Sequence, residues 1–147
     1  YPGVIGVHDL MIHDYGPGNL FATVHVEFPA ETPVIEAHEI MDEIERDFQE
    51  QEHMILTIHY DPIVEENAEV AEIRAFVSKA AKEFDERLSI HEVRLVPGNL
   101  SSNVIFDCVK PAGFKASDSE ITSYLQKRVT EWNPRYRCVI KVEQSYV

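Results

Sequence analysis

The segment Gly6-Val-His8-Asp-Leu10 has a counterpart in Ser89-Ile-His91-Glu-Val93, and this repeat predicts the fold of the chain. Two further pairs follow in the same order: Pro17-Gly-Asn-Leu20 with Pro97-Gly-Asn-Leu100, and Thr57-Ile-His-Tyr-Asp61 with Val139-Ile-Lys-Val-Glu143. Because three separate motifs recur in one order, the second half repeats the first, and we expect one structural unit in each half.

The local patterns assign the same elements to both halves. In the first half, apolar residues at positions 34, 37, 41, 44 and 48 have helical spacing. Segments rich in β-branched and aromatic residues, bounded by Pro and Gly, indicate strands. The expected elements are strands at 4–13 and 20–28, a helix at 33–48, a strand at 54–61, a helix at 66–88, strands at 89–96 and 102–109, a helix at 117–132 and a strand at 136–143.

This order predicts an α+β fold made of two tandem ferredoxin-like units. The first, over residues 1–64, reads β-β-α-β, and the second, over residues 65–147, reads α-β-β-α-β. In each unit, helices should pack on one face of a small, largely antiparallel sheet. Only the second unit has a leading helix, so we expect that most of the first unit's leading helix precedes Tyr1 in a longer protein.

Composition narrows the classes of function. The 147 residues include 44% hydrophobic ones, which is enough for a core. Thirteen basic residues stand against 26 acidic ones, and the formal net charge of −13 disfavours nucleic acid and anionic membrane surfaces while favouring cations. No apolar run is long enough to span a bilayer. The two cysteines, Cys108 and Cys138, are expected to be small buried apolar residues.

Histidines and carboxylates in the first half suggest a metal site. His59 and Asp61 lie two apart on a strand and share a face. His8 has the strand parity of Leu10 and Ile12, and His25 that of Glu27, whereas His38 lies beside the apolar stripe of the helix. Imidazole and carboxylate ligands suit Zn²⁺ better than Ca²⁺ or Mg²⁺. A single strand histidine is more often a polar surface residue, so spacing alone leaves both interpretations open.

Four motifs resemble the cytoplasmic C-terminal domain of cation diffusion facilitator transporters, which are cation efflux proteins. They are Gly6-Val-His-Asp-Leu10, Val24-His-Val-Glu27, Glu36-Ala-His-Glu-Ile40 and Ile58-His-Tyr-Asp-Pro62. The second unit, which ends in Ile140-Lys-Val-Glu-Gln-Ser-Tyr-Val147, resembles an extra tandem copy.

The resemblance implies a non-enzymatic regulatory domain on the cytoplasmic face of the membrane. It implies that the domain forms a homodimer, and that its other partner is the transmembrane domain of the same full-length exporter. It also implies metal ligands at His8, His25, His59 and Asp61, with His38 as a further candidate, for Zn²⁺ or another divalent ion such as Mn²⁺, Fe²⁺, Co²⁺ or Cd²⁺. Imidazole ligands must be neutral, so binding should weaken below about pH 6.5.

The second unit departs from this pattern. Asp107 stands in the place of His25, Lys141 in that of His59 and Glu143 in that of Asp61. We therefore expect an ion pair of Lys141 with Glu143 or Asp107 in a degenerate, metal-free copy. Three alternatives remain: a free-standing metal buffer, a module that senses a small molecule, and a metal-dependent hydrolase, although no hydrolase motif is present.

Overall fold

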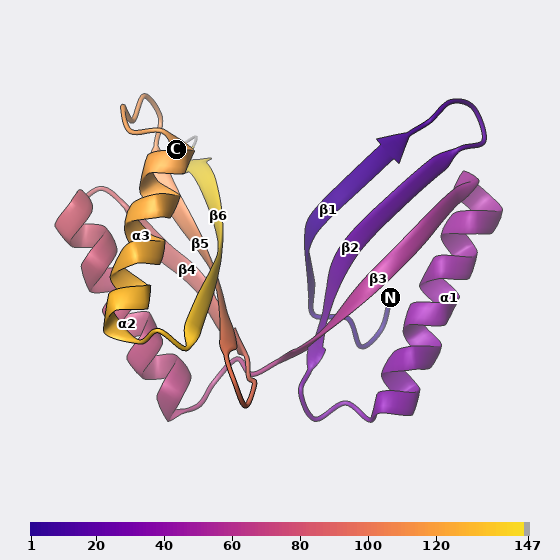
Figure 1. The fold of residues 1–147 in the computed structure, drawn as a ribbon, viewed down its shortest axis with the longest axis horizontal. Helices are drawn as coiled ribbons and strands as arrows, with labels where there is room; N and C mark the ends of the chain where they lie inside the picture. The colour runs from indigo at the N-terminus through magenta and orange to yellow at the C-terminus, as the bar shows by residue number, and fades with distance from the viewer. Residues whose placement is uncertain (146–147) are drawn as a thin grey trace. The chain divides into compact units, whose positions relative to one another are not determined.

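The computed structural model describes residues 1–145, and it divides the chain into two compact units, Tyr1–Ile63 and Val64–Val147. Tyr146 and Val147, which end the C-terminal motif, lie outside the described residues. The first unit contains β1 (Gly6–Asp14), β2 (Leu20–Pro29), α1 (Val34–Glu52) and β3 (Met54–Ile63). The second contains α2 (Ala68–Phe84), β4 (Ser89–Val96), β5 (Ser102–Pro111), α3 (Asp118–Trp132) and β6 (Tyr136–Ser145) (Figure 1).

Each unit has a three-stranded sheet with the same strand order and pairing. The orders are β1-β2-β3 and β4-β5-β6. The first two strands of each sheet pair antiparallel, whereas the second and third pair parallel. The sheets are therefore mixed rather than largely antiparallel, because the helix between the second and third strands is a crossover that returns the chain in the same direction. The α+β class with two ferredoxin-like units is confirmed.

The first strand of each unit contains a β-bulge at the same place in the repeat. The register shifts between His8 and Met11 in β1, where Asp9 has a φ of 53°. It shifts equally between His91 and Arg94 in β4. An extra residue in one strand moves every later side chain to the other face. Met11 pairs with Thr23 and Ile12 with Ala22, so Met11 shares the face of His8, and the expected shared face of His8 with Ile12 is wrong; Leu10 lies inside the bulge.

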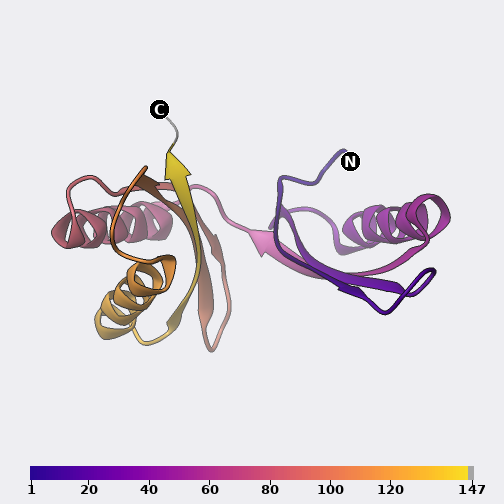
Figure 2. The same ribbon diagram turned by 90° about the horizontal axis from the view of Figure 1, so that it is seen from above.

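The core of the first unit lies between α1 and one face of its sheet. The even-numbered residues of β2, from Ala22 to Phe28, are buried there against Ala37 and Ile44 of the helix. The odd-numbered residues of β2, including His25, point to the opposite face. Figure 2 shows that in each unit the helices lie on one side of the sheet.

The second unit has two helices where the first has one. Helices α2 and α3 bury a core that includes Ile73, Leu95, Phe106 and Leu125. Residues 1–5 of the first unit form no helix. Ile12 of the first unit has the same position in the repeat as Leu95 of the second unit. Ile12 is 54% exposed, whereas Leu95 is 1% exposed. Among the helices of residues 1–145, none combines the length and apolar character that crossing a membrane requires.

Candidate metal centre

Three histidines form a row across the first sheet, on the face opposite α1. His8 pairs with His25 in the antiparallel ladder, and His25 pairs with His59 in the parallel ladder. The rings stack with centroids 4.7 Å apart for His8 and His25, and 4.4 Å apart for His25 and His59. Directly paired residues project in the same direction from a pleated sheet, so the register alone brings three imidazoles from three strands together.

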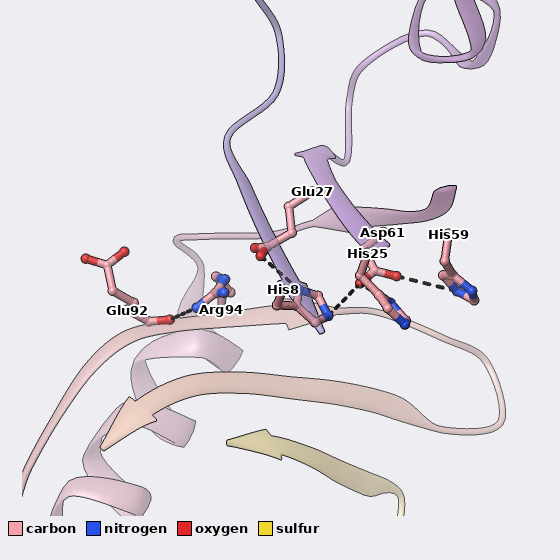
Figure 3. A network of polar contacts seen from close by, with 7 residues as sticks. All are labelled: His8, His25, Glu27, His59, Asp61, Glu92 and Arg94. Atoms are coloured by element: carbon pink, nitrogen blue, oxygen red, sulfur yellow. Dashed lines mark hydrogen bonds and ion pairs between the residues drawn. The ribbon is translucent and has the colours of Figure 1, made fainter. Parts of the chain in front are cut away.

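Two buried carboxylates complete the cluster, and both belong to the same pair of strands. Asp61 pairs with Glu27 two residues along the parallel ladder from His25 and His59, and thus on the same face. The Oδ2 atom of Asp61 lies 3.2 Å from Nε2 of His8 and 3.1 Å from Nδ1 of His25. The other nitrogen of His8, Nδ1, lies 3.0 Å from Oε2 of Glu27 (Figure 3). The ring of His8 thus lies between two carboxylates.

The geometry of three of these residues fits a transition-metal ion. Ligand atoms of His8, His25 and Asp61 all lie within 4.8 Å of one another. Ligands at about 2.0–2.1 Å from a tetrahedral Zn²⁺ lie roughly 3.3 Å apart. The two nitrogen-to-oxygen distances of 3.2 and 3.1 Å are close to that spacing. Two imidazoles and one carboxylate are also the donor set that Zn²⁺ and its neighbours prefer.

The other two candidate ligands differ in position. His59 adjoins the group, with Nε2 3.6 Å from Oδ1 of Asp61, and its side chain is 68% exposed. His38 lies exposed on α1, the helix that covers the opposite face of the sheet. The structure therefore brings His8, His25, His59 and Asp61 together in one chain and does not bring His38 to them.

Sequence reasoning did not select Glu27 as a site residue. The signal was present, because Glu27 follows His25 at the same spacing at which Asp61 follows His59. The sequence does not reveal the strand register, and it is the register that places Glu27 beside Asp61 and within hydrogen-bond distance of His8.

The second unit has the same strand register but different side chains at the corresponding positions. His91 pairs with Asp107, and Asp107 pairs with Lys141. The expected ion pair is confirmed, since Nζ of Lys141 lies 3.0 Å from Oε1 of Glu143, which raises the pKa of Lys141. Burial, followed by the charge of Glu143, raises the pKa of Asp107. Within residues 1–145, the only metal-competent group of three is the one in the first unit.

The two cysteines lie on β5 and β6 of the second unit. Cys108 is a free, fully buried thiol in the core of the second unit, and Cys138 is free and half-buried. Burial raises the pKa of Cys108 to about 11 and that of Cys138 to about 12. Both thiols therefore stay protonated at neutral pH, which suits the expected apolar role and not that of a metal ligand.

Comparisons with known proteins agree with the geometry of the first unit. Residues 1–63 match the family model described as the cytoplasmic domain of cation efflux proteins. No curated protein and no solved structure gives a significant match to the chain. The matched family is a non-enzymatic transporter domain, in agreement with the expectation that the chain is not an enzyme. The family match covers the whole first unit, which is similar to the cytoplasmic dimerisation domain of cation efflux proteins, and it does not extend into the second unit.

Proposed function

We propose that this chain is the regulatory part of a divalent-cation exporter, in which the first unit binds Zn²⁺ or a similar ion and the ion stabilises a homodimer. The observation that carries the proposal is the convergence of His8, His25 and Asp61, whose ligand atoms lie within 4.8 Å of one another. Two imidazoles and a carboxylate leave one position of a tetrahedral ion open. His59, or a group of a second chain, can fill that position.

The surface around the row supports the association of two chains. Exposed apolar side chains lie on the same sheet face as the histidines, namely Met11, Phe21 and Ile55. A groove of about 540 Å³ runs beside them and includes His25 and His59 in its lining. An apolar patch next to a metal site is typical of an interaction surface. A metal held by two chains stabilises only the dimer, so the ion concentration sets the dimer population.

The location follows from the same proposal. The matched family is a cytoplasmic domain, so we place this chain on the cytoplasmic face of the membrane beside the transmembrane domain of the same protein. If the gene also encodes a block of apolar helices of about 20 residues each beside this chain, that finding would support the exporter proposal. A gene that encodes this chain without such a block would support a free-standing metal-binding module.

The experiment that tests the proposal is a calorimetric titration of the full chain with Zn²⁺, combined with sedimentation at increasing Zn²⁺. We expect binding much tighter than millimolar and a rise in mass from monomer to dimer. His8→Ala should remove binding, whereas His91→Ala, at the same repeat position in the second unit, should not. Millimolar binding of the native chain, or equal affinities of the two variants, would sink the proposal. A small molecule that binds with Zn²⁺ absent, and equally well after His8→Ala, would favour the small-molecule sensor.

A further inference from the structure

We propose that Glu27 is a positioning residue of the metal centre, which holds a proton on Nδ1 of His8 and thereby directs Nε2 of that ring toward the metal. This inference rests on the proposed function and deepens it. Glu27 is 1% exposed, and its Oε2 lies 3.0 Å from Nδ1 of His8. On the other side of the same ring, Nε2 lies 3.2 Å from Oδ2 of Asp61.

The chemistry of the two groups gives the contact a direction. An ionised carboxylate can only accept hydrogen bonds, so the proton in this contact belongs to Nδ1 of His8. When a metal ion binds Nε2, the imidazole keeps a single proton, and the carboxylate of Glu27 favours that proton on Nδ1. Nε2 is the nitrogen beside Asp61, where the ligand atoms converge. Carboxylate partners of metal-ligating histidines fix the ring nitrogen that binds and the orientation of the ring.

Glu27 acts through His8 and is not itself a ligand. Its Oε2 contacts Nδ1, the nitrogen opposite the metal-facing Nε2, so the imidazole ring stands between Glu27 and the ligand atoms. The metal-competent group accordingly contains His8, His25 and Asp61 without Glu27.

The backbone beside Glu27 leaves room for its carboxylate. Gly6 pairs with Glu27 in the antiparallel ladder. A Cβ atom at position 6 would lie 3.1 Å from Oε2 and 3.3 Å from Cδ of Glu27. Those distances are tighter than ordinary carbon contacts, so a side chain at position 6 would require the carboxylate to shift by a few tenths of an ångström. The missing side chain of Gly6 therefore leaves the carboxylate of Glu27 in ordinary contact distance at its present position beside His8.

The second unit shows the arrangement without this pair. Ser89 takes the place of Gly6 and pairs with Val109, which takes the place of Glu27. With no carboxylate at that position, Nε2 of His91 lies 3.0 Å from Oγ of Ser89. In the copy that lacks the carboxylate, Nε2, which in His8 is the nitrogen beside Asp61, thus contacts a local hydroxyl group. Gly6 and Glu27 thus occur in the unit that has the metal-competent group, and the second unit has neither residue at the corresponding positions.

The test combines nitrogen NMR of the histidine rings with zinc titration of the full chain. In the metal-free native chain we expect Nδ1 of His8 to carry a proton. Glu27→Gln keeps the shape and removes the charge, so we expect zinc affinity to fall by about 10- to 100-fold, the usual effect of losing such a partner. Gly6→Ala leaves the carboxylate in the chain but displaces it, and we expect a loss in the same direction.

The matched control is Glu45→Gln. The carboxylate of Glu45 accepts a hydrogen bond from the backbone N–H of Ile58, so this variant removes one charge from the same unit without contacting His8. A bare Nδ1 on His8 in the native chain, or a loss of affinity in Glu27→Gln no larger than in Glu45→Gln, would overturn the positioning role. If the native chain binds no zinc, the proposed function fails. If it binds zinc and Glu27→Gln binds equally well, only the role of Glu27 fails.

Discussion

Asp61→Asn is the substitution that probes the candidate centre most directly. The Oδ2 atom of Asp61 lies within 3.2 Å of Nε2 of His8 and of Nδ1 of His25. Its Oδ1 atom is the one nearest His59. Asparagine has almost the same shape, but it carries no charge, and its NH₂ group has no lone pair to offer a metal. The variant therefore removes the only carboxylate of the metal-competent group while leaving the packing nearly unchanged.

The expected magnitude exceeds that of losing an indirect partner. Since a group that merely orients a ligand is worth about 10- to 100-fold in affinity, removal of a direct anionic ligand should cost more than 100-fold. A 100-fold loss corresponds to about 2.7 kcal/mol. Zinc at a concentration of 100 Kd stabilises the native unit by about 2.7 kcal/mol. The same zinc concentration stabilises a variant with a 100-fold higher Kd by only about 0.4 kcal/mol.

The first unit is Tyr1–Ile63, and in a domain of that size 1 kcal/mol shifts Tm by roughly 4–8 °C. The zinc-dependent rise in Tm of the first unit should therefore shrink by about 10 °C or more in Asp61→Asn. Calorimetric titration and thermal melts with and without Zn²⁺ measure the two effects. Glu143→Gln is the matched control, because it removes a carboxylate at the same repeat position in the second unit. Native zinc affinity in Asp61→Asn, or an equal loss in Glu143→Gln, would refute the assignment.

Three further variants give independent results. His59→Ala should weaken zinc binding less than Asp61→Asn does, because His59 is exposed and its nearest contact to Asp61 is 3.6 Å; a larger loss by titration would contradict this. Lys141→His, combined with Asp61→Asn, should create weak zinc binding in the second unit, because it restores an imidazole beside Asp107; a flat titration would argue against it. Asp107→Asn should raise Tm at neutral pH. Burial and then Glu143 raise the folded pKa of Asp107, so its stabilising contribution is present in acid and lost as pH rises through that folded pKa. The gain in Tm should therefore shrink in acid, and a pH-independent gain would disprove the cause.

The order of helices and strands could be predicted because each element of the repeat has its own local sequence pattern. Helical spacing from Val34 to Phe48 and the β-branched stretches depend on neighbouring residues alone. The pairing of strands depends on the path of the chain, and the parallel pairing of β2 with β3 was accordingly missed. The bulge at Asp9 was also missed, since the alternation of residues continues through it without interruption. That one residue decides that Met11, and not Ile12, shares the face of His8.

The candidate site was predictable to the extent that it follows from strand parity. His59 and Asp61 lie on one strand, so their shared face needed no knowledge of the fold. The partnership of His8 with Glu27 depends on the antiparallel register, which only the structure supplies. His38 is a candidate that the sequence pattern suggested and the structure places elsewhere. Its position beside the apolar stripe of α1 implied proximity to the sheet, but the helix packs on the face away from the histidines.

The second unit separates what the scaffold requires from what the metal requires. A residue with a left-handed backbone at a functional site invites the interpretation that its strain serves the site. Asp9, with a φ of 53°, directly follows the candidate ligand His8, but Glu92 adopts a φ of 57° at the same bulge of the second unit, where Lys141 replaces an imidazole. The bulge is therefore a property of the shared sheet. Since both units keep the same bulge and register, the metal-competent group of the first unit depends on its side chains, and the chemistry can be gained or lost without a change of fold.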